Sequence, residues 1–158
     1  MSDAQIRRQL RDVLAWGDAR VTFEKAVKGI PPRLRGVVPA GLPHSAWQLV
    51  EHIRLAQMDI LEFCVGRKYR HKKWPDDYWP ASPSPRNAAA WKRSLAAFRR
   101  DRRALQQLAT NRSIDLCDRV PNGDGQTFLR EILLVADHTS YHIGQLVLVR
   151  RALGNWSD

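Results

Sequence analysis

The chain has 158 residues, of which 44% are hydrophobic and 27% are charged. This length is typical of one domain, and this composition is that of a folded globular protein, so we expect a single domain over residues 1–158 and exclude a long disordered chain. No apolar run reaches the roughly 18 residues of a membrane span, and the polar start contains no apolar signal stretch. We therefore expect a cytoplasmic protein without a membrane partner.

The chain is strongly basic, with 26 Lys and Arg against 16 Asp and Glu and a formal net charge of +10. Basic residues concentrate at 67–73 and 92–103, which predicts either a polyanion-binding surface or solvated helix and loop surface. We favour solvated surface, because no nucleic-acid-binding motif accompanies the charge. Cys64 and Cys117 are too few and too scattered for a disulfide scaffold or a cysteine-based zinc site, so we expect free thiols.

Apolar residues recur at helical spacing in four long stretches, and no stretch alternates as a half-buried strand would. The first predicted helix runs from residue 3 to residue 29. The second begins at Ser45, where Gln48 completes a Ser-x-x-Gln capping box, and is expected to stop at Gly66 in a left-handed conformation.

Residues 67–86 interrupt the helical pattern with four prolines and several large rings. The third predicted helix starts at Asn87 as N-cap and ends near residue 110. The fourth spans residues 127–153 and is closed by Gly154. The sequence thus predicts an all-α four-helix bundle, with a long connection between the second and third helices that leaves room for a crossover topology.

Two histidines lie four residues apart on the fourth predicted helix, His138 and His142. Their rings are about 40° apart around the helix and about 6 Å apart along it, so both can reach one ion. His52 occupies the apolar stripe of the second helix. Together these residues offer three imidazoles, a ligand set for zinc, nickel, iron or manganese that leaves a coordination position open. The alternative interpretation is three hydrogen-bonded core histidines.

The residue after His138 is Thr139, so the glutamate of His-Glu-x-x-His metalloproteases is missing and a protease of that type is disfavoured. His44, just before the capping box, is interpreted as a turn residue rather than a fourth ligand. The rings of Trp74, Tyr78 and Trp79 in the long connection either cover the bundle or line a substrate pocket, and we favour packing.

Two segments carry a family resemblance: residues 43–54, PHSAWQLVEHIR, and residues 137–146, DHTSYHIGQL. With the Trp74-Pro75 and Trp79-Pro80 pairs of the connection, they resemble the signatures of the DinB/YfiT-like family of metalloenzymes, and the likeness extends over nearly the whole chain. The resemblance implies a four-helix bundle of unusual connectivity that binds one divalent metal through His52, His138 and His142. Zinc or nickel is the first expectation for that metal, with manganese or iron as alternatives.

Three further polar residues share the helical stripes of the histidines: Asp59, Glu131 and Gln145. Asp59 and Glu131 each lie two turns from a histidine, where either could orient an imidazole or move a proton, and Gln145 could hydrogen-bond a bound ligand. A role on the helix surface is the alternative for each of the three.

Known members of the family include thiol-dependent transferases and isomerases, so the resemblance implies a hydrolase or a thiol-dependent transferase acting on a small substrate. A low-molecular-weight thiol is then an expected partner. Long apolar helix faces commonly pair, so we also expect a homodimer. The alternative function is a non-catalytic bundle that binds nucleic acid or another polyanion through its basic surface and whose metal is structural.

Overall fold

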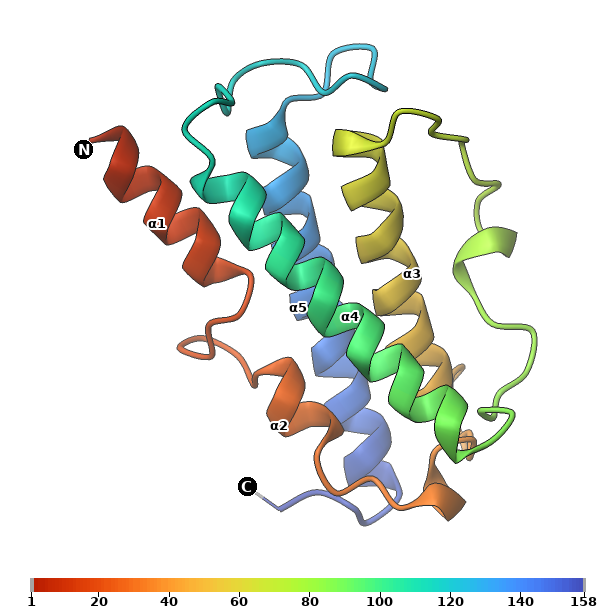
Figure 1. The fold of residues 1–158 in the computed structure, drawn as a ribbon. Helices are drawn as coiled ribbons and strands as arrows, with labels where there is room; N and C mark the ends of the chain where they lie inside the picture. Colours follow the sequence, from red (N-terminus) through yellow and green to blue (C-terminus); the bar gives the residue numbers. More distant parts are fainter. Residues whose placement is uncertain (1, 158) are drawn as a thin grey trace.

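The computed structural model describes residues 2–157 and is built of helices (Figure 1). In chain order these are α1 (Asp3–Val13), α2 (Phe23–Val27), α3 (Ala46–Val65), α4 (Ala88–Thr110) and α5 (Phe128–Ala152), with short 3-10 helices at Pro32–Leu34 and Asp76–Tyr78. No β-strand occurs within residues 2–157. The predicted all-α class is therefore confirmed.

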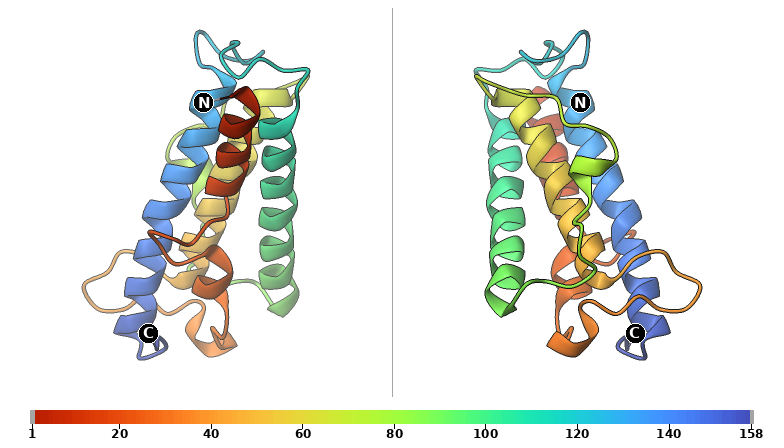
Figure 2. Two further views of the ribbon diagram at one scale, coloured as in Figure 1. Left: turned by 90° about the vertical axis from the view of Figure 1, so that its left-hand side faces the viewer. Right: turned by 90° about the vertical axis from the view of Figure 1, so that its right-hand side faces the viewer.

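The helices α3 and α4 follow one another in the chain yet run in the same direction, whereas α1 and α5 run the opposite way (Figures 1 and 2). Helix α3 packs against both α4 and α5, and α1 packs against α4. Because two consecutive helices can be parallel only if the chain returns along the bundle, residues 66–87 form a crossover segment beside α3. The long connection seen in the sequence is this crossover.

The expected first helix over residues 3–29 is wrong, because the structure divides it into α1 and α2. Gly17 has low helix propensity, and Thr22 starts a new helix by accepting a hydrogen bond from the Lys25 backbone N–H at 3.2 Å. The new direction buries Phe23 against Phe98, with ring centroids 3.8 Å apart. The Thr22 cap and the contact between Phe23 and Phe98 therefore favour two helices here, although the apolar residues are spaced as in one continuous helix.

Most of the predicted helix boundaries are present. Ser45 and Gln48 form the capping box of α3, Asn87 caps α4, and Gly154 is left-handed with φ 62°. Gly66 is not left-handed, since its φ is −70°. Its carbonyl instead accepts from the Asn122 side chain at 3.0 Å, and a Cβ at Gly66 would lie 2.5 Å from the Glu62 carbonyl, so close approach rather than φ requires glycine there.

Two clusters of buried apolar side chains fill the bundle. On α5, one cluster takes residues from Phe128 to Ala136 and the other takes residues from Ile143 to Val149. His138 and His142 lie between these two groups. Helix α5 is long and apolar enough to cross a membrane, by length and composition alone. The central helix of a bundle can have the same properties, and 44% of the most apolar 18-residue stretch of α5 is buried inside the protein.

Candidate metal centre

The three predicted ligands meet where the antiparallel helices α3 and α5 pack together. The Nε2 atom of His52 lies 3.0 Å from that of His142 and 3.0 Å from that of His138. One ring nitrogen from each residue lies within 4.8 Å of the others. His52 and His142 are buried, with 1% and 7% of their surface exposed, whereas His138 is partly exposed, so the group lies inside the bundle with His138 at its accessible side.

Two of the three histidines have their Nδ1 atoms engaged by acceptors. His52 Nδ1–H donates to the Tyr78 backbone carbonyl at 2.9 Å, and His142 Nδ1–H donates to Gln145 Oε1 at 2.7 Å. A neutral imidazole carries only one proton, so the Nε2 atoms of both residues present bare lone pairs. Two lone pairs that face each other at 3.0 Å repel, and a cation bound between them would remove that repulsion, so the arrangement fits a metal ion.

Protonation does not supply that cation near neutral pH. Burial and neighbouring imidazoles together lower the pKa of His138 to about 3. The same two causes lower the pKa of His52 to about 4, although its bond to the Tyr78 carbonyl acts in the opposite direction. Burial also lowers the pKa of His142, although its bond to Gln145 acts in the opposite direction. The neutral imidazole is the form that binds metal.

The donor set fits a divalent transition metal. Nitrogens bound at the usual zinc distance with tetrahedral angles lie about 3.3 Å apart, close to the spacing of the His52 and His142 nitrogens. Three neutral nitrogens suit zinc, nickel, iron or manganese, and they leave room for a further ligand.

Aromatic rings of the crossover segment cover the histidines. Trp79 stacks on His52 with ring centroids 3.9 Å apart and an interplanar angle of 3°. The same indole also stacks on His44, with ring centroids 4.0 Å apart. His44 does not belong to the group of three histidines whose ring nitrogens lie together. Trp79 therefore fixes the plane of one ligand ring, and His44 supports Trp79 from the chain just before α3.

A cavity of about 300 Å³ adjoins His138. Its walls are largely apolar and come from α3, α5 and the crossover segment, and they include Phe63, Tyr69, Trp74 and Tyr78. Trp74 is 66% exposed. Of the two interpretations of the crossover rings, packing describes Trp79, which stacks on the histidines, whereas Trp74 and Tyr78 line this cavity.

Comparison with models of protein families shows to which family this chain belongs. The model of the DinB superfamily matches residues 15–146, which include all three histidines. The chain belongs to the DinB superfamily. Comparisons with curated proteins and with solved structures found no match.

Among the polar residues predicted to support the site of this DinB-superfamily chain, Gln145 is the one that contacts a ligand histidine. Glu131 is 2% exposed, accepts a hydrogen bond from Arg130, and lines the cavity beside His138. It therefore lies at the cavity, and within the described part of the chain it forms no hydrogen bond to an imidazole.

Asp59 makes no contact with the histidines. Its carboxylate accepts from Tyr78 Oη at 2.6 Å, from Lys72 Nζ at 3.0 Å and from Tyr69 Oη at 3.3 Å. All three donors belong to the crossover segment, so Asp59 ties that segment to α3. Asp59 therefore acts on the centre indirectly, through Tyr78, whose backbone carbonyl accepts the hydrogen bond of His52 Nδ1–H.

Sequence reasoning missed the Tyr78 carbonyl and the anchoring role of Lys72. A backbone acceptor leaves no trace in side-chain identity, so nothing in the sequence marks the carbonyl. The pairing of Lys72 with Asp59 depends on the path of the crossover segment, which helical periodicity does not describe.

Proposed function

We propose that this DinB-superfamily protein is a metal-dependent enzyme that acts on a small substrate by hydrolysis or by thiol transfer. One observation carries the proposal: the bare Nε2 atoms of His52 and His142 face each other at 3.0 Å, with His138 beside them and a cavity next to His138. A purely structural metal needs no adjoining cavity. We therefore infer a catalytic role for the metal.

His52, His138 and His142 would hold the ion as neutral donors, zinc or nickel being the first expectation. When bound, a dication on three neutral ligands supplies a Lewis acid that lowers the pKa of water or a thiol. Gln145 and the Tyr78 carbonyl keep two imidazoles in the Nδ1–H tautomer, and Trp79 keeps water from one face of His52.

The cavity beside His138 is the proposed place for the substrate. Its volume of about 300 Å³ is at the lower end of small-molecule pockets, so the substrate is small. The rings of Tyr78 and Trp74 would contact its apolar part, and Glu131 could accept a hydrogen bond or a proton from it. A low-molecular-weight thiol is the proposed cosubstrate for group transfer.

The activity is tested by loading the metal-free protein separately with zinc, nickel and manganese. Each form is assayed against activated esters and amides, and against electrophilic acceptors in the presence of small thiols. The proposal expects turnover with at least one metal and its loss in His138→Ala, whereas His71→Ala, which changes an exposed histidine, retains it. Equal turnover by the metal-free protein would contradict the proposal.

Cobalt distinguishes the two reaction classes without an assay of turnover. If a thiol is the cosubstrate, adding it to the cobalt-loaded protein produces a sulfur-to-cobalt charge-transfer band in the near ultraviolet. A spectrum that thiols leave unchanged favours hydrolysis. The same titration on His138→Ala serves as the control for cobalt bound elsewhere.

A further inference from the structure

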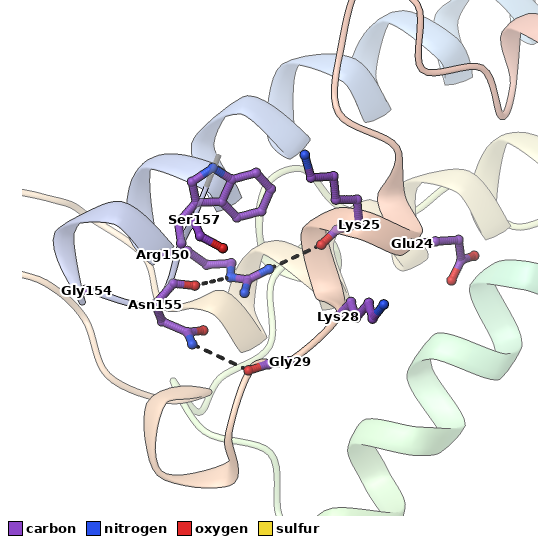
Figure 3. A pocket seen from close by; sticks show the side chains of 9 residues that line it. Glu24, Lys25, Lys28, Gly29, Arg150, Gly154, Asn155 and Ser157 are labelled. Carbon is purple, nitrogen blue, oxygen red and sulfur yellow. Dashed lines mark hydrogen bonds between the residues drawn. The ribbon is translucent and has the colours of Figure 1, made fainter.

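A second cavity lies at the end of the bundle where α2, the last turn of α5 and the C-terminal tail meet (Figure 3). Its volume is about 830 Å³, within the range of small-molecule sites. Arg150, which lines it, follows His142 by eight residues on α5, about 12 Å along the helix. This cavity is therefore separate from the histidine centre and shares no residue with the cavity beside His138.

A buried guanidinium forms the centre of the cavity wall. Arg150 is 7% exposed, and its Nη1 and Nε donate to the backbone carbonyls of Lys25, Ala26 and Asn155 at 2.8–3.2 Å (Figure 3). Within residues 2–157, no carboxylate forms an ion pair with it. Among the described residues, carbonyl dipoles and the face of Trp156 offset this charge and no carboxylate neutralises it, so the buried cation favours an anion nearby.

Two lysines add to the positive charge of the same cavity. Lys25 and Lys28 line it, and within the described part of the chain neither is paired with a carboxylate. Glu24 is the acidic residue among those that line the cavity, and its side chain is directed away from Arg150 (Figure 3). Arg99 and Arg102 hold its carboxylate at 2.6 and 3.1 Å. Among residues 2–157, the cavity thus presents three cations, and the one carboxylate that lines it is paired with Arg99 and Arg102.

The backbone at Gly29 leaves space beside the guanidinium. Gly29 has φ 76°, and a Cβ there would lie 4.0 Å from Arg150 Nη2, so the glycine keeps the approach to that nitrogen free of a side chain. Trp156 provides an apolar wall, with Arg150 Cζ 4.8 Å and Lys25 Nζ 5.6 Å from its ring centroid. Arginine and lysine grouped in this way are the residues that recognise phosphate groups.

We propose that this cavity binds a phosphorylated small molecule, whose phosphate group lies between Lys25, Lys28 and Arg150. The phosphate group carries two negative charges, which match the cations better than a single carboxylate does. The cavity is larger than a phosphate group alone, so its remaining volume, against Trp156, accommodates the organic part of the ligand.

The test is a calorimetric titration of the full-length protein in near-physiological salt with EDTA present, so that the probes cannot bind through a metal at the histidines. The probes are inorganic phosphate, ribose 5-phosphate and AMP, each compared with its unphosphorylated counterpart where one exists. Two charge-matched variants are compared: Lys25→Gln/Lys28→Gln in the cavity and Arg67→Gln/Lys68→Gln in the exposed part of the crossover segment.

The proposal expects saturable binding of the phosphorylated probes, weakened at least about tenfold by the cavity variant because two charge-assisted hydrogen bonds are lost. The Arg67→Gln/Lys68→Gln control should bind as the unaltered chain does, and His138→Ala should bind equally well. Tighter binding of AMP or ribose 5-phosphate than of inorganic phosphate identifies an organic phosphate as the ligand, and equal binding identifies the free ion. No binding of any probe, or equal weakening by the two charge-matched variants, overturns the proposal.

Discussion

At the scale of single residues, the centre depends on hydrogen bonds made on the far side of the imidazole rings. The Tyr78 carbonyl and Gln145 Oε1 each hold a proton on Nδ1, which turns the Nε2 lone pairs of His52 and His142 toward each other. In metal sites such outer partners fix the tautomer and raise the basicity of the ligand. Gln145 is the partner that a substitution can remove.

We predict that Gln145→Leu lowers the affinity for zinc by about 10- to 100-fold, the usual cost of losing such a partner. Gln145→Glu keeps an acceptor opposite His142 Nδ1 and should bind zinc about as tightly as the unaltered chain. Competition with a chromogenic chelator measures both constants. Gln107→Leu, on the exposed face of α4, is the control, and an equal affinity for all of these proteins would argue against the role of Gln145.

The lowered pKa values of the histidines predict how the metal-free protein responds to acid. His52 and His138 titrate at about 4 and about 3 in the folded chain, against an ordinary value of 6.5. Between the lowered pKa values and 6.5, the unfolded chain binds more protons than the folded chain does. The stability that comes from keeping these histidines neutral is therefore complete above pH 6.5 and is lost as the pH falls toward 4. Urea unfolding across that interval should show a smaller decline for His138→Gln than for the unaltered chain, and an identical decline would contradict the assignment.

The two cysteines should differ in reactivity. Burial, with a contribution from the charge of Glu131, raises the pKa of Cys64 to about 12, whereas Cys117 is exposed. We predict that a thiol reagent at pH 8 modifies one cysteine of the folded protein and both after denaturation. Mass spectrometry of the digested protein identifies the sites, and rapid modification of Cys64 in the folded chain would refute its burial.

At the scale of the elements, the crossover segment is part of the site rather than a simple connection. It supplies Tyr78, Trp79 and a wall of the cavity, and its main polar attachment to α3 is Asp59. Because the crossover segment runs back along α3, the helices α3 and α4 can be parallel, and Trp79 of the same segment covers His52 (Figure 1).

Asp59→Ala should loosen this attachment. We expect a loss of about 2 kcal/mol in the free energy of unfolding, because hydrogen bonds to a buried carboxylate are removed. Glu62→Ala is the matched control, since Glu62 lies 3.8 Å from the same Lys72 but is 54% exposed, and should cost less than about 0.5 kcal/mol. Urea unfolding compares the two variants, and equal costs would show that Asp59 does not anchor the segment.

Several helix boundaries followed from local signals in the sequence. The side chains of Ser45 and Asn87 cap the starts of α3 and α4, and Gly154 adopts a left-handed conformation after α5. The break between α1 and α2 could not be predicted in this way, since it depends on the packing of Phe23 against Phe98, 75 positions further along the chain.

At the scale of the whole molecule, the histidine trio was predictable because helical spacing and family resemblance select the same residues. The way in which α3 and the crossover segment place the Tyr78 carbonyl against His52 was not, because that contact is made by the backbone. The basic cavity around Arg150 was also missed, since its cations come from α2 and α5 and only tertiary packing brings them together. Much of the remaining basic charge is exposed, which is compatible with a solvated surface and with a polyanion-binding surface alike.

The central claim is that His52, His138 and His142 bind one metal ion. The most direct test is elemental analysis of protein purified without a histidine tag, beside His138→Ala and the exposed control His71→Ala. The account predicts about one equivalent of a divalent transition metal per chain in the unaltered protein and in His71→Ala, and its loss in His138→Ala. An unaltered protein that neither contains nor takes up zinc, nickel, manganese or iron, or a His138→Ala variant that binds as much metal, would contradict it.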